Sequence, residues 1–214
     1  MSTTETCLGV LIDSELMFAA HIRRLTGRCF YQLRQLRSIR RTLTTEAAKT
    51  LVHVLVINRV DYCNSIFGLT SAVHLRPFQS VVNAAARLII KRRKYGHITY
   101  SLRDDLHWLP IHYRCYYKLC IFIYKCLHCA ASSYIVDQCV AIAMNSAGNG
   151  LRSATNRSLA YPRTNLARYG QRSFDVIGPR TWNELPMDLR DPYISLDAFC
   201  KKLKTVLFSR AYYS

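Results

Sequence analysis

The adjacent carboxylates Asp104 and Asp105 are the side chains that could most directly do chemistry. Paired aspartates can hold the Mg²⁺ ions of a two-metal catalytic site. Such a pair belongs in a tight turn between apolar strands, whereas the surrounding string SLRDDLHW is typical of a helix that stops at a Trp-Leu-Pro sequence. We therefore interpret the pair as a solvated helix face, with an enzyme of unfamiliar site as the alternative.

A second group of reactive side chains lies between residues 115 and 129, and comprises Cys115, Cys120, Cys126, His128 and Cys129. Zinc sites usually place a second ligand pair at a defined loop distance, but these cysteines alternate with Tyr, Leu, Ile and Phe. Packing in a helix core is the favoured interpretation; metal binding and C-x-x-C redox chemistry are the alternatives. The sequence also contains no glycine-rich phosphate loop and no G-x-S-x-G elbow. It predicts no catalytic residue and no cofactor in this chain.

The charge balance points to a polyanionic partner. Thirty Lys and Arg residues against 13 Asp and Glu residues give a net charge of +17, which self-repulsion makes mildly unfavourable. Arginine dominates the basic residues, and its planar fork pairs bidentately with phosphate and stacks on bases. These properties favour a nucleic acid over the alternative of a basic composition that serves only solubility or reflects a biased genome. For the arginine-rich helix described next, the alternatives are a solvated basic face, an acidic protein partner and an anionic lipid surface.

The strongest local signal is an arginine-rich helix over residues 18–41. Its apolar residues recur at spacings of three and four, as on an amphipathic helix, and no acidic residue lies between Leu16 and Thr45. A later cluster follows a predicted helix end, where capping of the helix dipole is the alternative role. The candidate nucleic-acid-binding residues are Arg23, Arg24, Arg28, Arg34, Arg37, Arg40, Arg41, Lys91, Arg92, Arg93 and Lys94.

The remaining pattern predicts a mainly α fold that begins with one short strand and ends in a less regular α+β segment. Leu8–Ile12 is an apolar β-branched run that predicts a buried strand without an obvious partner. Helices are expected at 45–67, with Leu51, Val54, Leu55 and Val60 on the core face, from Pro77 to about 90, at 98–106, 111–127 and 196–209. Short strands are expected at 159–161 and 172–177.

Eight strings, in order, resemble the C-terminal region of reverse transcriptases from LINE-type (non-LTR) retrotransposons of the CR1 and jockey-like sort. They cover nearly the whole chain: LGVLIDSEL (8–16), CFYQLRQLRSIRR (29–41), TTEAAKTLVH (44–53), RVDYCNS (59–65), VVNAAARLI (81–89), LHWLP (106–110), PRTNLARYGQRSF (162–174) and GPRTWNELP (178–186).

The resemblance implies a layout. Residues 1–13 would hold an orphan palm strand with Leu8 and Gly9 in a primer-grip-like position, and 14–95 a helical thumb-like bundle. After it, the residue pattern itself predicts a further helical segment at 96–144, a linker rich in Asn, Ser and Gly at 145–158, and a less regular α+β segment at 159–214. The thumb would grip RNA, DNA or an RNA–DNA hybrid, mainly by backbone contacts.

The same resemblance implies that the catalytic palm, with its aspartates and Mg²⁺, is missing. We therefore expect a fragment of an RNA-directed DNA polymerase that is not active alone, located inside the cell, in the cytoplasm or the nucleus, and not in a membrane. A domesticated RNA-binding or protein-interaction module is the alternative from another class.

Overall fold

The chain is mainly helical and divides into two compact units, residues 1–115 and 116–214. The computed structural model describes residues 4–70, 72–93, 95–139, 157–162, 170 and 173–213. The boundary between the units falls within helix α5 (Ile111–Leu127). No helix in these described ranges is both long and apolar enough to cross a bilayer. Lys94 and most of the expected linker at 145–158 lie outside the described residues.

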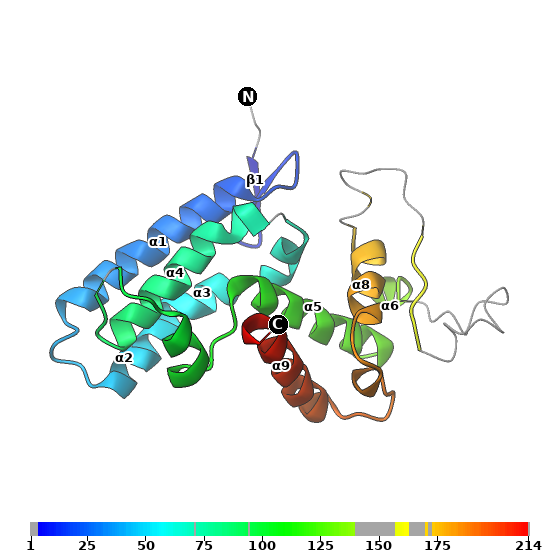
Figure 1. Ribbon diagram of the computed structural model, residues 1–214. Helices are drawn as coiled ribbons and strands as arrows, with labels where there is room; N and C mark the ends of the chain where they lie inside the picture. The colour runs from blue at the N-terminus through cyan, green and yellow to red at the C-terminus, as the bar shows by residue number, and fades with distance from the viewer. Residues whose placement is uncertain are drawn as a thin grey trace. The chain divides into compact units, whose positions relative to one another are not determined.

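A β-hairpin stands at the start of α1 in Figure 1. Strands β1 (Thr4–Cys7) and β2 (Val10–Asp13) pair antiparallel, with Thr4 opposite Asp13. Leu8 and Gly9 form the turn with φ values of 47° and 82°, as a two-residue hairpin turn of type I′ requires. The expected single strand at 8–12 is therefore wrong in its first half, and the strand is not an orphan. The sequence did not predict the partner strand β1, TETC, because it is mostly polar and lacks an apolar run.

Helix α1 (Ala19–Ser38) confirms the predicted arginine-rich helix over most of its length, but it ends before the expected residue 41, so that Arg40 and Arg41 lie in the turn that follows. It buries Ile22, Cys29, Leu33 and Leu36, which are apolar residues of the predicted stripe. Helix α4 (Ala72–Ile89) lies alongside α1 in Figure 1, and the two make the most extensive helix–helix contact of the first unit. The buried Ala85 and Ala86 of α4 leave room for this close approach.

The second predicted helix is divided by a wider turn. Thr44 caps α2 (Thr45–Val52) by accepting a hydrogen bond from the Ala47 amide at 3.2 Å. A π-helical segment, η1 (His53–Ile57), and α3 (Asn58–Asp61) continue it. The π turn changes the buried face: Val54, expected in the core, is 55% exposed, whereas Val56 and Ile57 are buried. The helical run ends at Asp61 rather than at 67, and a 3₁₀ helix, η2 (Asn64–Leu69), follows.

Two other boundaries of the first unit differ from the prediction. Helix α4 begins at Ala72, so Pro77 lies in its second turn and not in its first. The expected helix at 98–106 is shorter, and a π-helical segment, η3 (Ser101–Asp105), forms its main part. The start of α5 is held by the Gln79 side chain, which accepts a hydrogen bond from the Ile111 amide at 2.8 Å, and by an Arg114–Asp61 ion pair at 2.8 Å.

The second unit contains most of α5, α6 (Ser133–Val136), α8 (Phe174–Asn183), η6 (Met187–Leu189) and α9 (Leu196–Tyr212). α5 matches its predicted bounds and α9 runs three residues beyond the expected end. The buried Phe199 ring of α9 stacks against Tyr124 of α5 at 4.7 Å and against Trp182 of α8 at 5.9 Å. These rings form the centre of the second core.

Neither of the two predicted strands is present among the described residues of the second unit. The prediction of a strand at 172–177 is wrong, because helix α8 begins at Phe174. Leu159 is buried, and the Asn183 side chain bonds both its amide, at 2.8 Å, and its carbonyl, at 2.9 Å. Leu159 therefore forms only an isolated β-bridge in place of the expected strand, and a side-chain amide bonds its backbone N–H and carbonyl.

Candidate nucleic-acid interface

The arginines of α1 occupy two flanks of the helix and not one stripe. At about 100° per residue, Arg23, Arg34 and Arg37 project to one side of the buried face. Arg24 and Arg28 project to the other. Surface cavities agree with this division, because Arg23 lines one with Val73 and His74 of α4, whereas Arg24 and Arg28 line another with Arg59 of α3.

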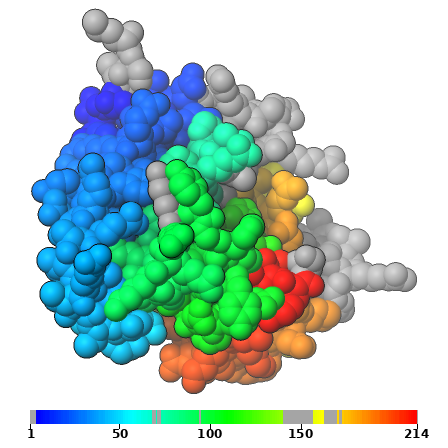
Figure 2. Space-filling view, turned by 60° about the vertical axis from the view of Figure 1, so that its left-hand side comes forward, coloured from blue at the N-terminus to red at the C-terminus, as the bar shows by residue number. Residues whose placement is uncertain are grey.

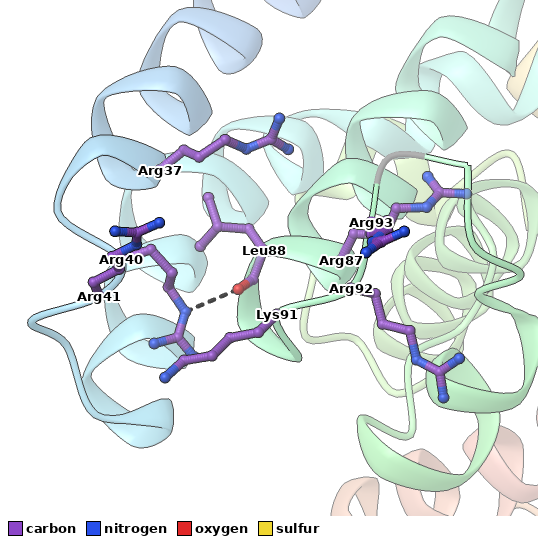
Figure 3. A pocket seen from close by; sticks show the side chains of 8 residues that line it. All are labelled: Arg37, Arg40, Arg41, Arg87, Leu88, Lys91, Arg92 and Arg93. Atoms are coloured by element: carbon purple, nitrogen blue, oxygen red, sulfur yellow. Dashed lines mark hydrogen bonds between the residues drawn. The ribbon is translucent and has the colours of Figure 1, made fainter.

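A larger cavity of about 450 Å³ lies where the ends of α1 and α4 come together (Figure 3). We call it the basic cavity. In Figure 3, Arg40 and Arg41 lie on one side of Leu88 and Arg92 and Arg93 on the other, whereas the Lys91 side chain extends past Leu88 towards Arg40. Its lining contains no acidic residue and comprises Arg37, Arg40, Arg41, Arg87, Leu88, Lys91, Arg92 and Arg93.

The end of α4 positions the second half of this cluster. Lys91 has a left-handed backbone, with φ of 55°. The Arg92 amide bonds the Arg87 carbonyl at 2.9 Å, and the Lys91 amide bonds the Leu88 carbonyl at 3.4 Å. These two bonds define a Schellman motif, which usually has glycine at the left-handed position. The motif reverses the chain so that the exposed Lys91, Arg92 and Arg93 gather at the helix end.

Arg40 has a structural role in place of the predicted exposed one. Its side chain is only 6% exposed. Its Nε donates to the Leu88 carbonyl at 2.8 Å, as the dashed line in Figure 3 shows, Nη2 to the Ile89 carbonyl at 2.6 Å, and Nη1 to the Leu43 carbonyl at 2.8 Å. Arg40 therefore caps the end of α4, and three of its five N–H donors bond carbonyls within the protein. We remove it from the set of candidate phosphate ligands.

Arg87 is a lining residue that the sequence prediction missed. It is half-buried, and its Nε donates to the Gly96 carbonyl at 3.1 Å. Its position four residues before Lys91, one helical turn earlier, was the available signal. This hydrogen bond ties the loop after Lys94 back to α4 and helps to fix the cavity wall.

The cavity carries positive charge that no carboxylate neutralises within the described residues. The three ion pairs among them are Arg103–Asp104, Arg114–Asp61 and Arg157–Asp191, and none includes a residue of the basic cavity. Arg37, Arg41, Lys91, Arg92 and Arg93 are all exposed. The arrangement therefore offers several guanidinium forks to one anionic ligand, which is the geometry that phosphate groups need.

The other predicted residues lie apart from this cavity. In Figure 2 the blue and light-blue atoms, which belong to the first hairpin, α1 and the turn after it, cover much of the left of the face in view. Arg23, Arg24, Arg28 and Arg34 are exposed on α1 but do not line the basic cavity. Leu8 and Gly9 form the hairpin turn, where Leu8 is 83% exposed. Their primer-grip-like role stays a prediction.

Most of the residues considered for catalysis are buried or paired within the protein, whereas Asp105 and Cys129 are exposed. The Arg103 guanidinium binds the Asp104 carboxylate at 3.0 Å. Cys115, Cys120 and Cys126 are buried, which confirms their packing role, and Cys129 is exposed. Burial raises the pKa of Cys115 to about 12 and that of Cys120 further, so both stay protonated thiols at neutral pH. In the part of the chain that is described, no three His, Cys, Asp or Glu residues are grouped as metal ligands.

Comparison with protein-family models, curated proteins and solved structures finds no match for this chain. The fold and the cavity therefore define only a class: a mainly helical protein with an uncompensated basic cavity.

Proposed function

We propose that the first unit binds nucleic acid through its phosphates, and that the chain is the thumb-like and C-terminal part of a LINE-type reverse transcriptase. The observation that carries the proposal is the basic cavity. Residues about fifty positions apart in sequence, from α1 and from the end of α4, converge there with no acidic residue in the lining. The family assignment is supported by the eight ordered sequence strings.

The chemistry of such binding is electrostatic. Each phosphate contact from arginine or lysine releases condensed counterions, so affinity falls as salt rises and sequence is not read. Guanidinium forks of Arg37, Arg41 and Arg92 would each pair with two phosphate oxygens. In the family context this contact would hold the template–primer hybrid. Mg²⁺ and the catalytic carboxylates would belong to a palm domain outside this chain.

The test is fluorescence anisotropy with a labelled RNA–DNA hybrid at several salt concentrations between about 50 and 200 mM. The triple variant Arg37→Gln, Arg41→Gln, Arg92→Gln removes three exposed charges from the cavity. We expect its affinity to fall alike for all sequences, and the salt slope to decrease by about one for each phosphate that the variant no longer binds.

The matched control removes the same charge elsewhere. Lys201, Lys202 and Lys204 are exposed on α9 of the second unit, and their replacement by Gln lowers the net charge equally. An equal decrease of affinity in both triple variants would show that binding depends only on net charge and would contradict the cavity proposal.

A second titration, with labelled poly-glutamate, tests the alternative of an acidic protein partner. Binding it as tightly as the hybrid would favour a protein-interaction module.

A further inference from the structure

A smaller cavity of about 190 Å³ lies beside the hairpin, on the flank of α1 opposite to the one that carries Arg37. We call it the hairpin-side cavity. It contains three exposed arginines and no carboxylate, and its lining comprises Gly9, His21, Arg24, Leu25, Arg28, Arg59 and Tyr62. Arg59 was not among the residues predicted from sequence. Because one water occupies roughly 30 Å³ of liquid, this volume has room for a phosphate-sized anion.

His21, one of the residues that line this cavity, carries a buried donor without a partner among the described residues. The ring is only 7% exposed, and its Nδ1 accepts a hydrogen bond from the Leu11 amide at 3.1 Å. Since Nδ1 is an acceptor, the neutral ring carries its proton on Nε2. That Nε2–H is buried and has no hydrogen-bond partner in the described part of the chain. A buried donor without a partner is unfavourable and points to a ligand that supplies an acceptor.

The walls of the cavity are held in place independently of any ligand. The Tyr62 hydroxyl donates to the Leu8 carbonyl at 2.9 Å, which ties the hairpin turn to the residue that follows α3. The His21 ring packs against the buried Phe67 ring at 5.5 Å. Asp13 accepts hydrogen bonds from the Glu15 and Met17 amides at 3.1 and 2.9 Å, fixing the chain between β2 and α1. The backbone around the cavity and the His21 ring are therefore positioned before an anion arrives, and the exposed side chains of Arg24, Arg28 and Arg59 surround them.

We propose that the hairpin-side cavity is a phosphate-binding site. The Nε2–H of His21 donates to one phosphate oxygen, and the guanidinium groups of Arg24, Arg28 and Arg59 bind the others. A phosphate suits the site better than a carboxylate, because its additional oxygens and charge match four donor side chains that come from two helices. The ligand chemistry has two possible sources, a free phosphate or the backbone phosphate of a nucleic-acid strand. The site does not depend on the function proposed for the basic cavity.

The experiment follows the His21 ring by ¹H–¹⁵N NMR in the whole chain. Inorganic phosphate, pyrophosphate and a single-stranded oligonucleotide are titrated at constant ionic strength, which NaCl maintains. We expect a saturable shift of the His21 Nε2 resonance with at least one of these probes. No shift with any probe, or an equal shift with NaCl alone, overturns the proposal.

Variants assign the shift to the cavity. Arg28→Gln with Arg59→Gln should weaken phosphate binding by about tenfold or more, since two charge-assisted hydrogen-bonding groups are removed. Arg76→Gln with Arg180→Gln removes the same charge from exposed positions of α4 and α8, and should leave the affinity unchanged. An unchanged affinity in the cavity variant overturns the proposal, and the shift of wild-type His21 tests it even if that variant folds poorly.

The different probes and variants identify the source of the bound phosphate, and they test the hairpin-side cavity separately from the basic cavity. A shift with the oligonucleotide that disappears in the Arg28, Arg59 variant identifies a strand phosphate, and a shift with free phosphate or pyrophosphate alone identifies a small anion. The Arg37, Arg41, Arg92 variant should bind the hybrid weakly but keep the His21 shift with phosphate. Failure of hybrid binding therefore does not contradict the phosphate site in the hairpin-side cavity. Failure of phosphate binding likewise does not contradict hybrid binding at the basic cavity.

Discussion

Arg40 and Arg41 are neighbours with the same side chain, and the fold gives them different tasks. Both side chains line the basic cavity, but Arg40 is buried against the end of α4 with three carbonyl partners, whereas Arg41 is exposed. Hydrogen bonds from a charged donor contribute about 1.5–3 kcal/mol each. The two positions therefore separate stability from binding within one dipeptide.

Replacing Arg40 with Met should lower the free energy of unfolding by about 2–4 kcal/mol, because several buried carbonyls would be left without a donor. Replacing Arg41 with Met should change it by less than about 0.5 kcal/mol and weaken nucleic-acid binding instead. Urea unfolding followed by circular dichroism measures the first effect. Equal destabilisation by the two changes would contradict the capping role of Arg40.

His21 makes the stability of the first unit depend on pH. Burial, followed by the nearby Arg24 and Arg28, lowers the pKa of His21 below its usual value of 6.5, and Arg59 and Tyr62 line the same cavity. The unfolded chain therefore binds the proton more readily than the folded chain. The contribution of His21 to the free energy of unfolding should be constant above pH 6.5. It should fall as the pH drops from there towards the pKa of His21 in the folded chain.

The comparison is with His21→Gln, whose amide can accept from Leu11 and donate without titrating in this range. Urea unfolding in phosphate-free buffers at a series of pH values should show a shallower pH dependence in this variant. The same slope in both proteins would assign the effect to another group.

At the scale of elements, α4 and α5 end in the same way. In α5 the Ala130 amide bonds the Lys125 carbonyl at 2.8 Å, the Cys129 amide bonds the Cys126 carbonyl at 3.2 Å, and Cys129 has φ of 52°. Lys91 has the matching position in α4, with φ of 55°. A left-handed backbone costs a residue other than glycine about 1–2 kcal/mol, so both helix ends hold strained residues where glycine is preferred.

Lys91→Gly and Cys129→Gly should each stabilise the unit that contains the change, by up to about 1 kcal/mol after the larger entropy of unfolded glycine is counted. Thermal unfolding measures this gain. Only Lys91→Gly should weaken nucleic-acid binding, because only Lys91 lines the basic cavity. If Lys91→Gly left the affinity unaltered while raising stability, the Lys91 side chain would have no part in binding.

For the whole molecule, the net charge of +17 is the dominant property. The described residues contain three ion pairs, and the arginines of both cavities lie outside them. Positive side chains gathered at the ends of α1 and α4 repel one another in the folded state. Salt should reduce that repulsion, because the Debye length falls from about 30 Å at 0.01 M to about 10 Å at 0.1 M.

We therefore expect the melting temperature to rise when NaCl increases from about 0.01 to 0.1 M, as measured by circular dichroism. The Arg37, Arg41, Arg92 variant should melt higher than the wild type at low salt, and the difference should shrink at high salt. A lower melting temperature of the variant at low salt would show that these side chains stabilise the fold by interactions that outweigh their repulsion.

The sequence by itself determined the local elements and the sign of the charge. The apolar stripe of α1, the bounds of α5 and the start of α2 after Thr44 follow from periodicity and capping, which act within a few residues. The tertiary structure decided what the arginines do. Arg40 finds carbonyl partners 48 and 49 positions away, and Arg59 joins Arg28 across two elements. Periodicity cannot encode which helix ends meet, since that depends on packing of the whole core.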